Sequence, residues 1–271
     1  MAGVADPSQT LAAVAGWLRE ATHVTALTGA GISTESGIPD FRGPNGVWTR
    51  DPKAERVSHI DVYLAEPQVR VQAWRTRMAH PAWAAQPNPG HIALVELERQ
   101  GRLHALVTQN IDGLHALAGT SPRILVEIHG TMRDVLCLDC GDRGPARATF
   151  ERVRAGDDDP PCRRCGGILK SATISFGQSL VPEDLDRAQE AAQRCDLFLA
   201  VGSSLTVYPA AALPQIAKRA GARLVIVNGE PTPLDPLADV VLRGPIGEIL
   251  PRLVPRPSEP APRASEPAPR A

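Results

Sequence analysis

The chain has few cysteines and no long apolar run. Only five of its 271 residues are cysteine, and four of these stand in two C-x-x-C pairs, which indicates a metal site rather than disulfides. No apolar stretch is long enough to span a bilayer. The N-terminal MAGVADPSQT has neither the basic start nor the apolar block of a signal peptide. We therefore expect a cytoplasmic protein that contacts no membrane.

An excess of charge of one sign is also absent. The formal net charge is -1 and the pI is about 6.7, so bulk charge gives no reason to expect nucleic acid as a partner. The basic residues are nearly all arginine, with lysine only at Lys53, Lys170 and Lys218, which indicates the coding bias of a high-GC genome. Hydrophobic residues make up 43% of the chain, enough for a full core in one large α/β domain with insertions or in two small domains.

Apolar runs alternate with amphipathic helical patterns along most of the chain. We predict strands at 23–28, 103–108, 124–128, 197–201, 224–227 and 240–242, and helices at 8–21, 90–100, 182–194, 209–220 and 246–253. The run at 197–201 is apolar throughout, as in strands that are buried on both faces of a parallel sheet. This alternation of strands and helices predicts an α/β fold with a doubly wound parallel sheet.

Residues 28–43 read TGAGISTESGIPDFRG and follow the first predicted strand. Glycines directly after a strand let the backbone approach a phosphate, and the N–H groups of a following helix point at it. Gly29 and Gly31 match the first two glycines of the dinucleotide motif G-x-G-x-x-G, but Thr34 stands where the third is expected. The alternative is an ordinary tight turn. The Pro-Asp-Phe-Arg extension after Gly37 disfavours it, because a plain turn needs no aromatic and arginine at its end.

Polar residues follow two further strands. The strand at 103–108 is followed by Gln109, Asn110, Ile111 and Asp112, and the strand at 124–128 by His129. In open α/β sheets ligands bind beyond the carboxyl ends of the strands, so we expect these tails to meet residues 29–33 in one crevice. Histidine is the side chain best suited to act as a base near neutral pH. A lone histidine is more often structural, but this position at a strand end favours a chemical role.

The two cysteine pairs are Cys137-x-x-Cys140 and Cys162-x-x-Cys165. This spacing is typical of a closed, tetrahedral, four-thiolate zinc site, with Gly141 and residues 166–167 providing the tight turns. The alternative, a redox-active dithiol, needs one pair and not two. Because protein fills all four positions, we expect a structural ion with no place for a reactive water. The fifth cysteine, Cys195, is expected to pack as a small apolar residue.

Two segments differ from the α/β pattern. Residues 44–89 carry three tryptophans and many charges without a strand-like run, so we predict a helical insertion whose tryptophans pack its core. From residue 255 the chain is low in complexity, and SEPAPRA occurs twice, at 258–264 and 265–271. A segment without apolar bulk cannot bury a core, so we expect a disordered tail over residues 255–271.

Taken in order, these motifs resemble those of the sirtuin family of NAD-dependent protein deacylases. The resemblance extends over about residues 21–253. The residues that carry it are Gly29-Ala30-Gly31-Ile32-Ser33, Gly37-Ile38-Pro39-Asp40-Phe41-Arg42-Gly43, Thr108-Gln109-Asn110-Ile111-Asp112, His129-Gly130, the four paired cysteines, Phe176-Gly177, Gly202-Ser203-Ser204 and Asn228. It implies a deacetylase domain over 1–254, with a Rossmann-like large part (8–43, 90–130, 176–254). A smaller domain would come from two insertions, the helical segment at 44–89 and the zinc module at 131–175.

The resemblance also implies an activity: NAD-dependent removal of acetyl groups from protein lysine, giving nicotinamide and O-acetyl-ADP-ribose. The acyl oxygen would attack C1′ of the nicotinamide ribose, and His129 would act as general base on the ribose hydroxyls, assisted by Asn110 and Asp112. The implied cofactor contacts are Gly29, Ala30, Gly31, Ser33, Thr34, Asp40, Phe41, Arg42, Gln109, Asn110, Ile111, Asp112, Gly202, Ser203, Ser204, Asn228 and Ile246. NAD would be co-substrate, and one structural Zn²⁺ would be held by Cys137, Cys140, Cys162 and Cys165. The acetylated peptide would add as a strand between Phe176-Gly177 and Val207.

The chain departs from the family pattern on the peptide side. Residues 170–175 read KSATIS where many relatives have Arg-Pro, and Gln178 stands where an acidic residue is common. The family branch that removes succinyl and malonyl groups carries Tyr-x-x-Arg in the helical insertion. Residues 73–78 contain no tyrosine, which favours neutral acyl groups such as acetyl, although Arg75 and Arg77 leave acidic ones open.

Two other functions compete with deacetylation. One is a mono-ADP-ribosyltransferase on the same fold, which the joint presence of Asn110 and His129 disfavours. The other is a zinc-ribbon module that binds nucleic acid or protein, for which the chain offers no basic patch with interleaved aromatics. The expected partners are acetylated protein lysines, with a monomer favoured and no nucleic acid expected.

Overall fold

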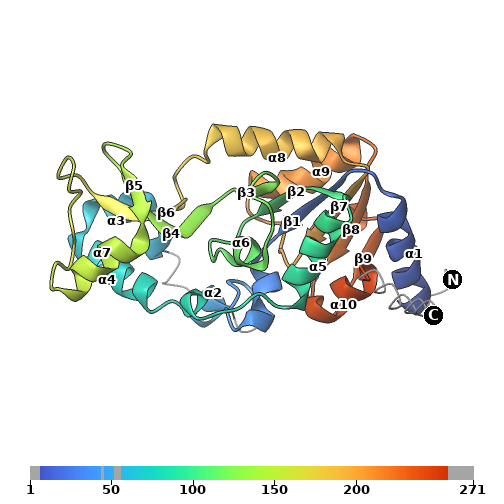
Figure 1. The fold of residues 1–271 in the computed structure, drawn as a ribbon, viewed down its shortest axis with the longest axis horizontal. Coiled ribbons are helices and arrows are strands. Elements are labelled where there is room, and N and C mark those ends of the chain that lie inside the picture. Colours follow the sequence, from blue (N-terminus) through green and yellow to red (C-terminus); the bar gives the residue numbers. More distant parts are fainter. Residues whose placement is uncertain (1–6, 44–45, 52–55, 256–271) are drawn as a thin grey trace, which may run out of the picture.

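The computed structural model describes residues 7–43, 46–51 and 56–255, so the tail predicted at 255–271 lies almost wholly outside the described residues. Within these ranges a six-stranded sheet has the order β3-β2-β1-β7-β8-β9, and all neighbouring strands are parallel (Figure 1). The strands are β1 (Val24–Thr28), β2 (Leu103–Thr108), β3 (Leu125–Glu127), β7 (Leu197–Val201), β8 (Arg223–Val227) and β9 (Val240–Leu242). The strand order reverses between β1 and β7, which makes this the point where ligands bind in doubly wound sheets.

Helices cover both faces of this sheet. The helices α1 (Pro7–Glu20), α5 (Pro89–Arg99) and α10 (Ile246–Leu253) share one apolar core with one face, and α8 (Pro182–Arg194) and α9 (Leu213–Arg219) share a second core with the other. Strand β7 is buried on both sides, with Leu199 in the first core and Phe198 in the second. The predicted doubly wound α/β architecture is confirmed.

Short helical turns adjust some of the predicted boundaries. The glycine stretch continues as a 3₁₀ helix, η1 (Ala30–Ser36), which ends at Gly37 in the left-handed region (φ 83°). The helix predicted at 209–220 is divided into a 3₁₀ turn, η4 (Ala210–Ala212), and α9, whose first turn contains Pro214. A short helix, α6 (Leu114–Ala118), and a 3₁₀ turn, η5 (Asp235–Leu237), were not predicted.

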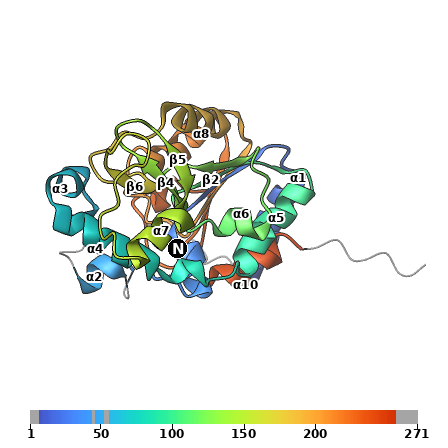
Figure 2. The same cartoon turned by 60° about the vertical axis from the view of Figure 1, so that its left-hand side comes forward.

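A second, smaller sheet lies at the other end of the molecule (Figures 1 and 2). Its antiparallel strands are β5 (Arg143–Pro145), β4 (Gly130–Cys137) and β6 (Leu169–Thr173), in that order. They pack with α7 (Ala146–Arg154) and with the predicted helical insertion, which contains α2 (Val47–Arg50), α3 (Ile60–Ala65), α4 (Pro67–Met78) and η3 (Pro81–Trp83). Trp74 is buried in this core and Trp83 packs against it, as predicted, whereas the side chain of Trp48 lies outside the described part.

The two sheets are connected at His129. This residue lies between the end of β3 and the start of β4, and its backbone carbonyl accepts a hydrogen bond from the Ile174 N–H just beyond β6. The residue that follows the parallel sheet is therefore held by both sheets. Among the described helices, none is both long and apolar enough to cross a membrane.

Candidate active site

The loops after β1 and β7 touch each other at the point where the strand order reverses. The Gly31 N–H donates to the Gly202 carbonyl at 2.8 Å. A Cβ on Gly31 would lie 2.8 Å from Gly202 Cα, and one on Gly202 would lie 2.4 Å from the Ile32 nitrogen. Gly202 also has a φ of 62°, in the left-handed region that favours glycine. Side chains are therefore excluded here, and bare backbone is left to face a ligand.

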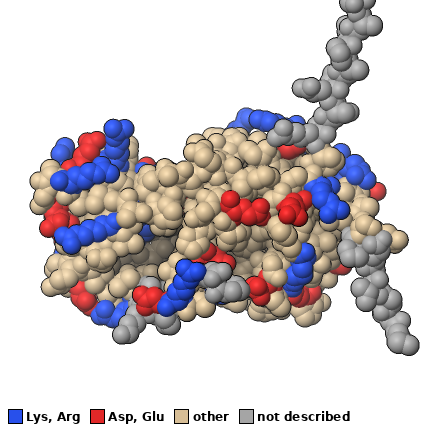
Figure 3. Space-filling view, turned by 90° about the horizontal axis from the view of Figure 1, so that it is seen from below, with Lys and Arg blue, Asp and Glu red and all other residues tan. Residues whose placement is uncertain are grey.

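A cavity of about 1530 Å³ opens beside these loops. Figure 3 shows the surface hollowed between the two ends of the molecule. The structure brings every predicted cofactor, catalytic and peptide residue to this one cavity: Gly29, Ala30, Gly31, Ser33, Thr34, Asp40, Phe41, Arg42, Gln109, Asn110, Ile111, Asp112, His129, Phe176, Gly177, Gly202, Ser203, Ser204, Val207, Asn228 and Ile246. The tails of the parallel strands thus meet in one crevice, as the sequence predicts.

A buried hydrogen-bond network connects the first two strand ends. The Asn110 Nδ2 amide donates to the Gly29 carbonyl and to Ser33 Oγ, both at 3.1 Å. Ser33 Oγ in turn donates to Asp112 Oδ2 at 2.8 Å, and the Leu114 N–H donates to Asp112 Oδ1 at 2.9 Å. These bonds fix the orientation of the Asn110 amide and occupy both of its N–H donors, which leaves Oδ1 as the atom that can accept from a bound hydroxyl.

His129 stands at the third strand end. Its Nδ1 lies 3.1 Å from the Gln109 carbonyl, and because a carbonyl only accepts, Nδ1 carries the proton. The other ring nitrogen, Nε2, is then the unprotonated one. Burial lowers the pKa of His129, and this effect outweighs the opposing hydrogen bond to the Gln109 carbonyl. The imidazole is therefore neutral near pH 7 and is able to take up a proton at Nε2.

The proposed peptide segment is already paired along one edge. The Phe176 N–H donates to the Ser58 carbonyl at 3.0 Å, and the Phe176 carbonyl accepts from the Ile60 N–H at 2.9 Å. The Ser175 N–H is bonded to the Gln178 side chain at 2.9 Å. Within the part of the chain that the structure describes, Gly177 has no backbone hydrogen bond, so its N–H and carbonyl are the groups available to an added strand.

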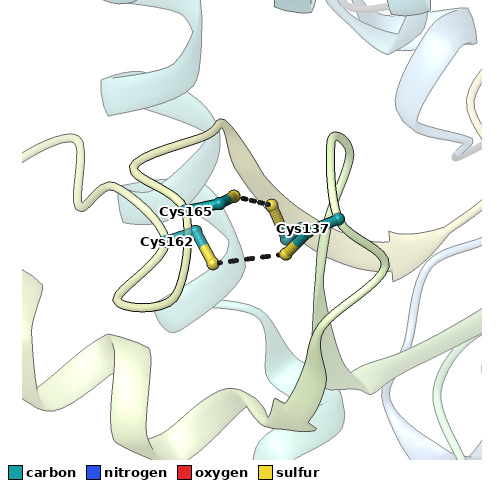
Figure 4. A group of neighbouring side chains, drawn as sticks. Cys137, Cys162 and Cys165 are labelled. Carbon is teal, nitrogen blue, oxygen red and sulfur yellow. Dashed lines mark hydrogen bonds between the residues drawn. The ribbon is translucent and has the colours of Figure 1, made fainter.

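The four paired cysteines form one cluster. Their Sγ atoms all lie within 4.8 Å of one another, with Cys137 and Cys165 at 3.5 Å and Cys140 and Cys162 at 3.8 Å (Figure 4). Zinc–sulfur bonds of about 2.3 Å in a tetrahedron place the sulfurs about 3.8 Å apart, so the cluster fits Zn²⁺. The N–H groups of Gly141 and Gly166 close the predicted turns onto the first cysteine of each pair. Cys195 is buried in the core beneath α8, as predicted.

A sequence model of the Sir2 family matches residues 29–209, the segment that contains these strand ends and all four cysteines.

The chain belongs to the Sir2 family. It is 52% identical over 231 residues to NAD-dependent protein deacetylase 2 of Streptomyces coelicolor, covering 85% of this chain and 96% of that protein. It is also 45% identical over 240 residues to NAD-dependent protein deacylase 2 of Archaeoglobus fulgidus, covering 88% of this chain and 92% of that one.

Solved Sir2 structures have the same fold. One, described as Sir2 with a p53 peptide and NAD+, has a TM-score of 0.78 and 35% identity, and the match covers 88% of this chain and 94% of that one. Another, a Sir2 variant with a deacetylated p53 peptide and 3′-O-acetyl ADP ribose, has a TM-score of 0.83 and 35% identity, and the match covers 90% of this chain and 96% of that one. The Rossmann-like sheet and the four-cysteine module of this chain are therefore those of a Sir2 fold.

Sequence reasoning did not connect the residues of one wall of the cavity. Tyr63 and Arg77 on the helical insertion and Lys170 on β6 line it, together with His80. Burial, reinforced by nearby Arg77, lowers the pKa of Lys170 to about 8, and burial lowers the pKa of His80 to about 4. The sequence singles out Arg77 as leaving acidic acyl groups open and Lys170 as part of a departure from the family pattern, but α4 and β6 are too far apart in sequence for a motif to connect them.

Proposed function

We propose that this Sir2-family chain removes acetyl groups from protein lysines in an NAD-dependent reaction that yields nicotinamide and O-acetyl-ADP-ribose. The observation that carries the proposal is the position of His129. Its neutral imidazole lines the same cavity as the fixed Asn110 amide and the side-chain-free Gly31–Gly202 contact. The relatives named NAD-dependent protein deacetylase and deacylase support the same activity.

We propose that NAD lies across the switch point of the sheet. The bare backbone at Gly29, Gly31 and Gly202 fits the close approach of a pyrophosphate, and polar groups at Ser204 and Asn228 extend the same wall. When bound, NAD supplies the ribose C1′ that loses nicotinamide and the ribose hydroxyl that receives the acyl group. The further contacts assigned from the sequence, from Thr34 and Asp40 to Ile246, are part of this proposal.

The protein groups have separate proposed roles. His129 Nε2 takes the proton from a ribose hydroxyl, while the Gln109 carbonyl holds the tautomer that leaves Nε2 free. Asn110 orients a ribose hydroxyl or a water through Oδ1, and Asp112 holds Ser33 and the loop in place. Phe41, which is 42% exposed, shields C1′ from renewed attack by nicotinamide, beside Arg42.

The acetylated peptide is proposed to add as a strand between Gly177 and Val207. Both residues line the cavity, and Gly177 carries the available backbone groups, so binding depends little on the peptide sequence. The proposed smaller domain comprises 44–89 and 131–175, with the larger part formed by 8–43, 90–130 and 176–254. Zn²⁺ on the four cysteines would hold the smaller domain together and stay outside the chemistry.

The partners are proposed to be acetylated protein lysines, and the enzyme is proposed to act as a monomer in the cytoplasm. Four thiols arranged for a metal suit a reducing compartment, which supports this location. Light scattering of the purified chain tests the monomer, which a stable dimer would contradict.

Incubation with NAD labelled in its adenosine half and with an acetylated peptide tests the function. We expect the label to appear in a small acetylated nucleotide, in an amount equal to the acetyl lost from the peptide. Label joined covalently to protein, with the acetyl group retained, would instead establish the rival mono-ADP-ribosyltransferase activity.

A further inference from the structure

Arg133 lies behind the wall of the active-site cavity. It stands on β4, its side chain is half-buried, and the described cavity lining does not include it. Its guanidinium binds the backbone of two other segments. Nε and Nη2 donate to the Asp112 carbonyl at 3.0 and 2.8 Å, and Nη2 also donates to the Ala82 carbonyl at 2.9 Å. One side chain of the small sheet is therefore bonded both to the loop after β2 and to the turn η3.

The Asp112 carbonyl depends on this arginine. Within the described residues, the hydrogen bonds that this carbonyl accepts come from Arg133 alone. The preceding carbonyl, that of Ile111, accepts from the Met132 N–H at 2.9 Å, so two successive residues of β4 hold two successive carbonyls of the loop. A charged donor makes a stronger bond than a neutral one, and a buried carbonyl that loses its donor stays unsatisfied. Arg133 therefore contributes strongly to the fixed position of this loop.

Asp112 connects Arg133 with the buried network of the site. Its carboxylate accepts from Ser33 Oγ at 2.8 Å, and Ser33 Oγ accepts from the Asn110 amide at 3.1 Å. Asp112, Ser33 and Asn110 all line the cavity. A shift of the Asp112 backbone moves its carboxylate, and with it the hydroxyl and the amide. The connection from Arg133 to Asn110 is made through hydrogen bonds at every contact.

The core of the small sheet fixes the guanidinium from the other side. Arg133 Cζ lies 4.8 Å from the centroid of the Trp83 ring, within the range of a cation–π contact. The Trp83 ring packs edge-on against Phe150, with centroids 5.3 Å apart, and its N–H donates to the Arg77 carbonyl at 2.7 Å. Phe150 shares an apolar core with Cys137 and Cys162. Arg133 therefore joins the core beside the four-cysteine cluster to the loop after β2.

Gly113 leaves the space that this side chain fills. A Cβ on Gly113 would lie 3.0 Å from Arg133 Nε and 3.2 Å from its Cγ. Gly119, at the other end of α6, also has a left-handed backbone, with a φ of 103° against 74° at Gly113. A Cβ on Gly119 would meet nothing within 4 Å. The two glycines that flank α6 thus share a backbone requirement and differ in their contact with Arg133.

We propose that Arg133 is a positioning residue for NAD. By holding the Asp112 carbonyl, it keeps Ser33 and Asn110 in the arrangement that receives the ribose. It acts through these residues and not by touching NAD or acyl-lysine, because it lies outside the cavity lining. The proposal rests on the NAD-dependent function and adds a residue that acts on it from the small sheet. Loss of the guanidinium is expected to weaken NAD binding and to spare binding of the acetylated peptide.

The first test measures NAD affinity by calorimetry with the full zinc-loaded chain and without peptide. Arg133→Met keeps the aliphatic stem and loses the donors, so we expect NAD binding weaker by about tenfold or more and a matching rise in the KM for NAD. Arg133→Lys keeps the charge and should recover part of the loss. Arg143→Met is the matched control, because Arg143 is 54% exposed on β5 and pairs with Asp134. Wild-type NAD affinity in folded Arg133→Met protein would overturn the proposal.

A double-mutant cycle tests whether Arg133 acts through the network. Ser33→Ala disconnects the Asn110 amide from the Asp112 carboxylate. If Arg133 acts through this connection, Arg133→Met costs much less NAD affinity in the Ser33→Ala background than in the wild type. A loss of the same size in both backgrounds would mean that Arg133 only stabilises the fold, and would contradict the positioning role.

The two glycines provide a test that leaves Arg133 in place. Gly113→Ala and Gly119→Ala both put a side chain in the left-handed region and both lower stability, but only the first displaces the guanidinium. We therefore expect only Gly113→Ala to weaken NAD binding, to about the extent of Arg133→Met. The rise in melting temperature at saturating NAD, taken from each variant's own value, separates binding from stability. Equal NAD affinity in the two alanine variants would count against the proposal.

Failure of this proposal differs from failure of the proposed function. Unchanged NAD affinity in Arg133→Met protein that still removes acetyl groups would sink the positioning role and leave the deacetylase function intact. Weaker NAD binding in Arg133→Met and Gly113→Ala, with no deacetylation by the wild-type chain, would do the reverse.

Discussion

His129 and Gln109 are joined by a hydrogen bond from the imidazole Nδ1–H to the backbone carbonyl, 3.1 Å long. Gln109 is the first residue after β2, and its own N–H is bonded to the Thr28 carbonyl at the end of β1, at 2.9 Å. The tautomer of the histidine is therefore set by the ends of the neighbouring parallel strands. This is how the sheet prepares Nε2 to act as a base.

The pH dependence of turnover should reflect this histidine. Because burial lowers the pKa of His129 below its ordinary value of 6.5, the neutral, active form persists on the acid side of that value. We expect kcat/KM to rise with pH through an apparent pKa below 6.5 and then to level off. An acid limb of the kcat/KM profile with an apparent pKa above 6.5 would contradict the buried setting of the His129 imidazole. His129→Ala should lower kcat/KM by roughly 10²- to 10⁴-fold and remove the acid limb.

Removal of the Ser33 hydroxyl should damage both stability and NAD use. Ser33→Ala leaves Asp112 Oδ2 buried without its donor and removes one of the two acceptors of the Asn110 amide. We expect about 1–3 kcal/mol less free energy of unfolding and a higher KM for NAD. Urea unfolding and initial rates measure the two effects. Thr34→Ala removes an exposed hydroxyl and is the control for the unfolding measurement. If Thr34→Ala lowered the free energy of unfolding as much as Ser33→Ala, the importance of the buried network would be refuted.

A methyl group at Gly31 should not fit. Gly31→Ala would place a Cβ 2.8 Å from Gly202 Cα, so the loops after β1 and β7 must separate. We expect about 1–3 kcal/mol of destabilisation and weaker NAD binding, measured by unfolding and calorimetry. Gly144→Ala in β5, where a Cβ would meet nothing within 4 Å, should change neither. Normal NAD affinity in folded Gly31→Ala protein would be incompatible with a pyrophosphate at this contact.

Removal of the metal should unfold the small sheet first. Cys137 and Cys162 share an apolar core with Trp74 and Phe150, so loss of Zn²⁺ frees both turns and loosens that core. We expect one zinc per chain, and a chelator should expose tryptophan, as seen in its fluorescence, and lower the melting temperature. Cys140→Ser should lose the metal, whereas Cys195→Ser, remote from the cluster, should keep it. Full zinc content in Cys140→Ser would argue against a four-thiolate site.

The parallel sheet is predictable because its signals are local. The bounds of β2, β7, β9, α8 and α10 match the prediction residue for residue, since the apolar runs of the three strands end at Gly or polar residues and each helix begins at or directly after a proline. The small sheet is not predictable in this way. Strand β4 reads GTMRDVLC, without clean alternation, and it forms because β6 pairs with it and Trp74 packs against it.

The candidate site likewise has a part that local signals predict and a part that depends on long-range packing. Residues that follow strand ends, such as Asn110 and His129, could be placed in one crevice from topology alone. The approach of Arg77 to Lys170 could not, because it depends on how α4 packs on a sheet whose strands the sequence does not reveal. Such long-range contacts carry no periodic signal.

The most direct test of the deacylase account is a quenched single turnover with ¹⁸O in the acetyl carbonyl of the peptide lysine. The proposed chemistry transfers that oxygen to the ribose C1′ while nicotinamide departs and the acetyl group moves to a ribose hydroxyl. The label should therefore appear on C1′ of O-acetyl-ADP-ribose, in an amount equal to the nicotinamide released. Label that remains in the acetyl group, or in free acetate, would contradict the account.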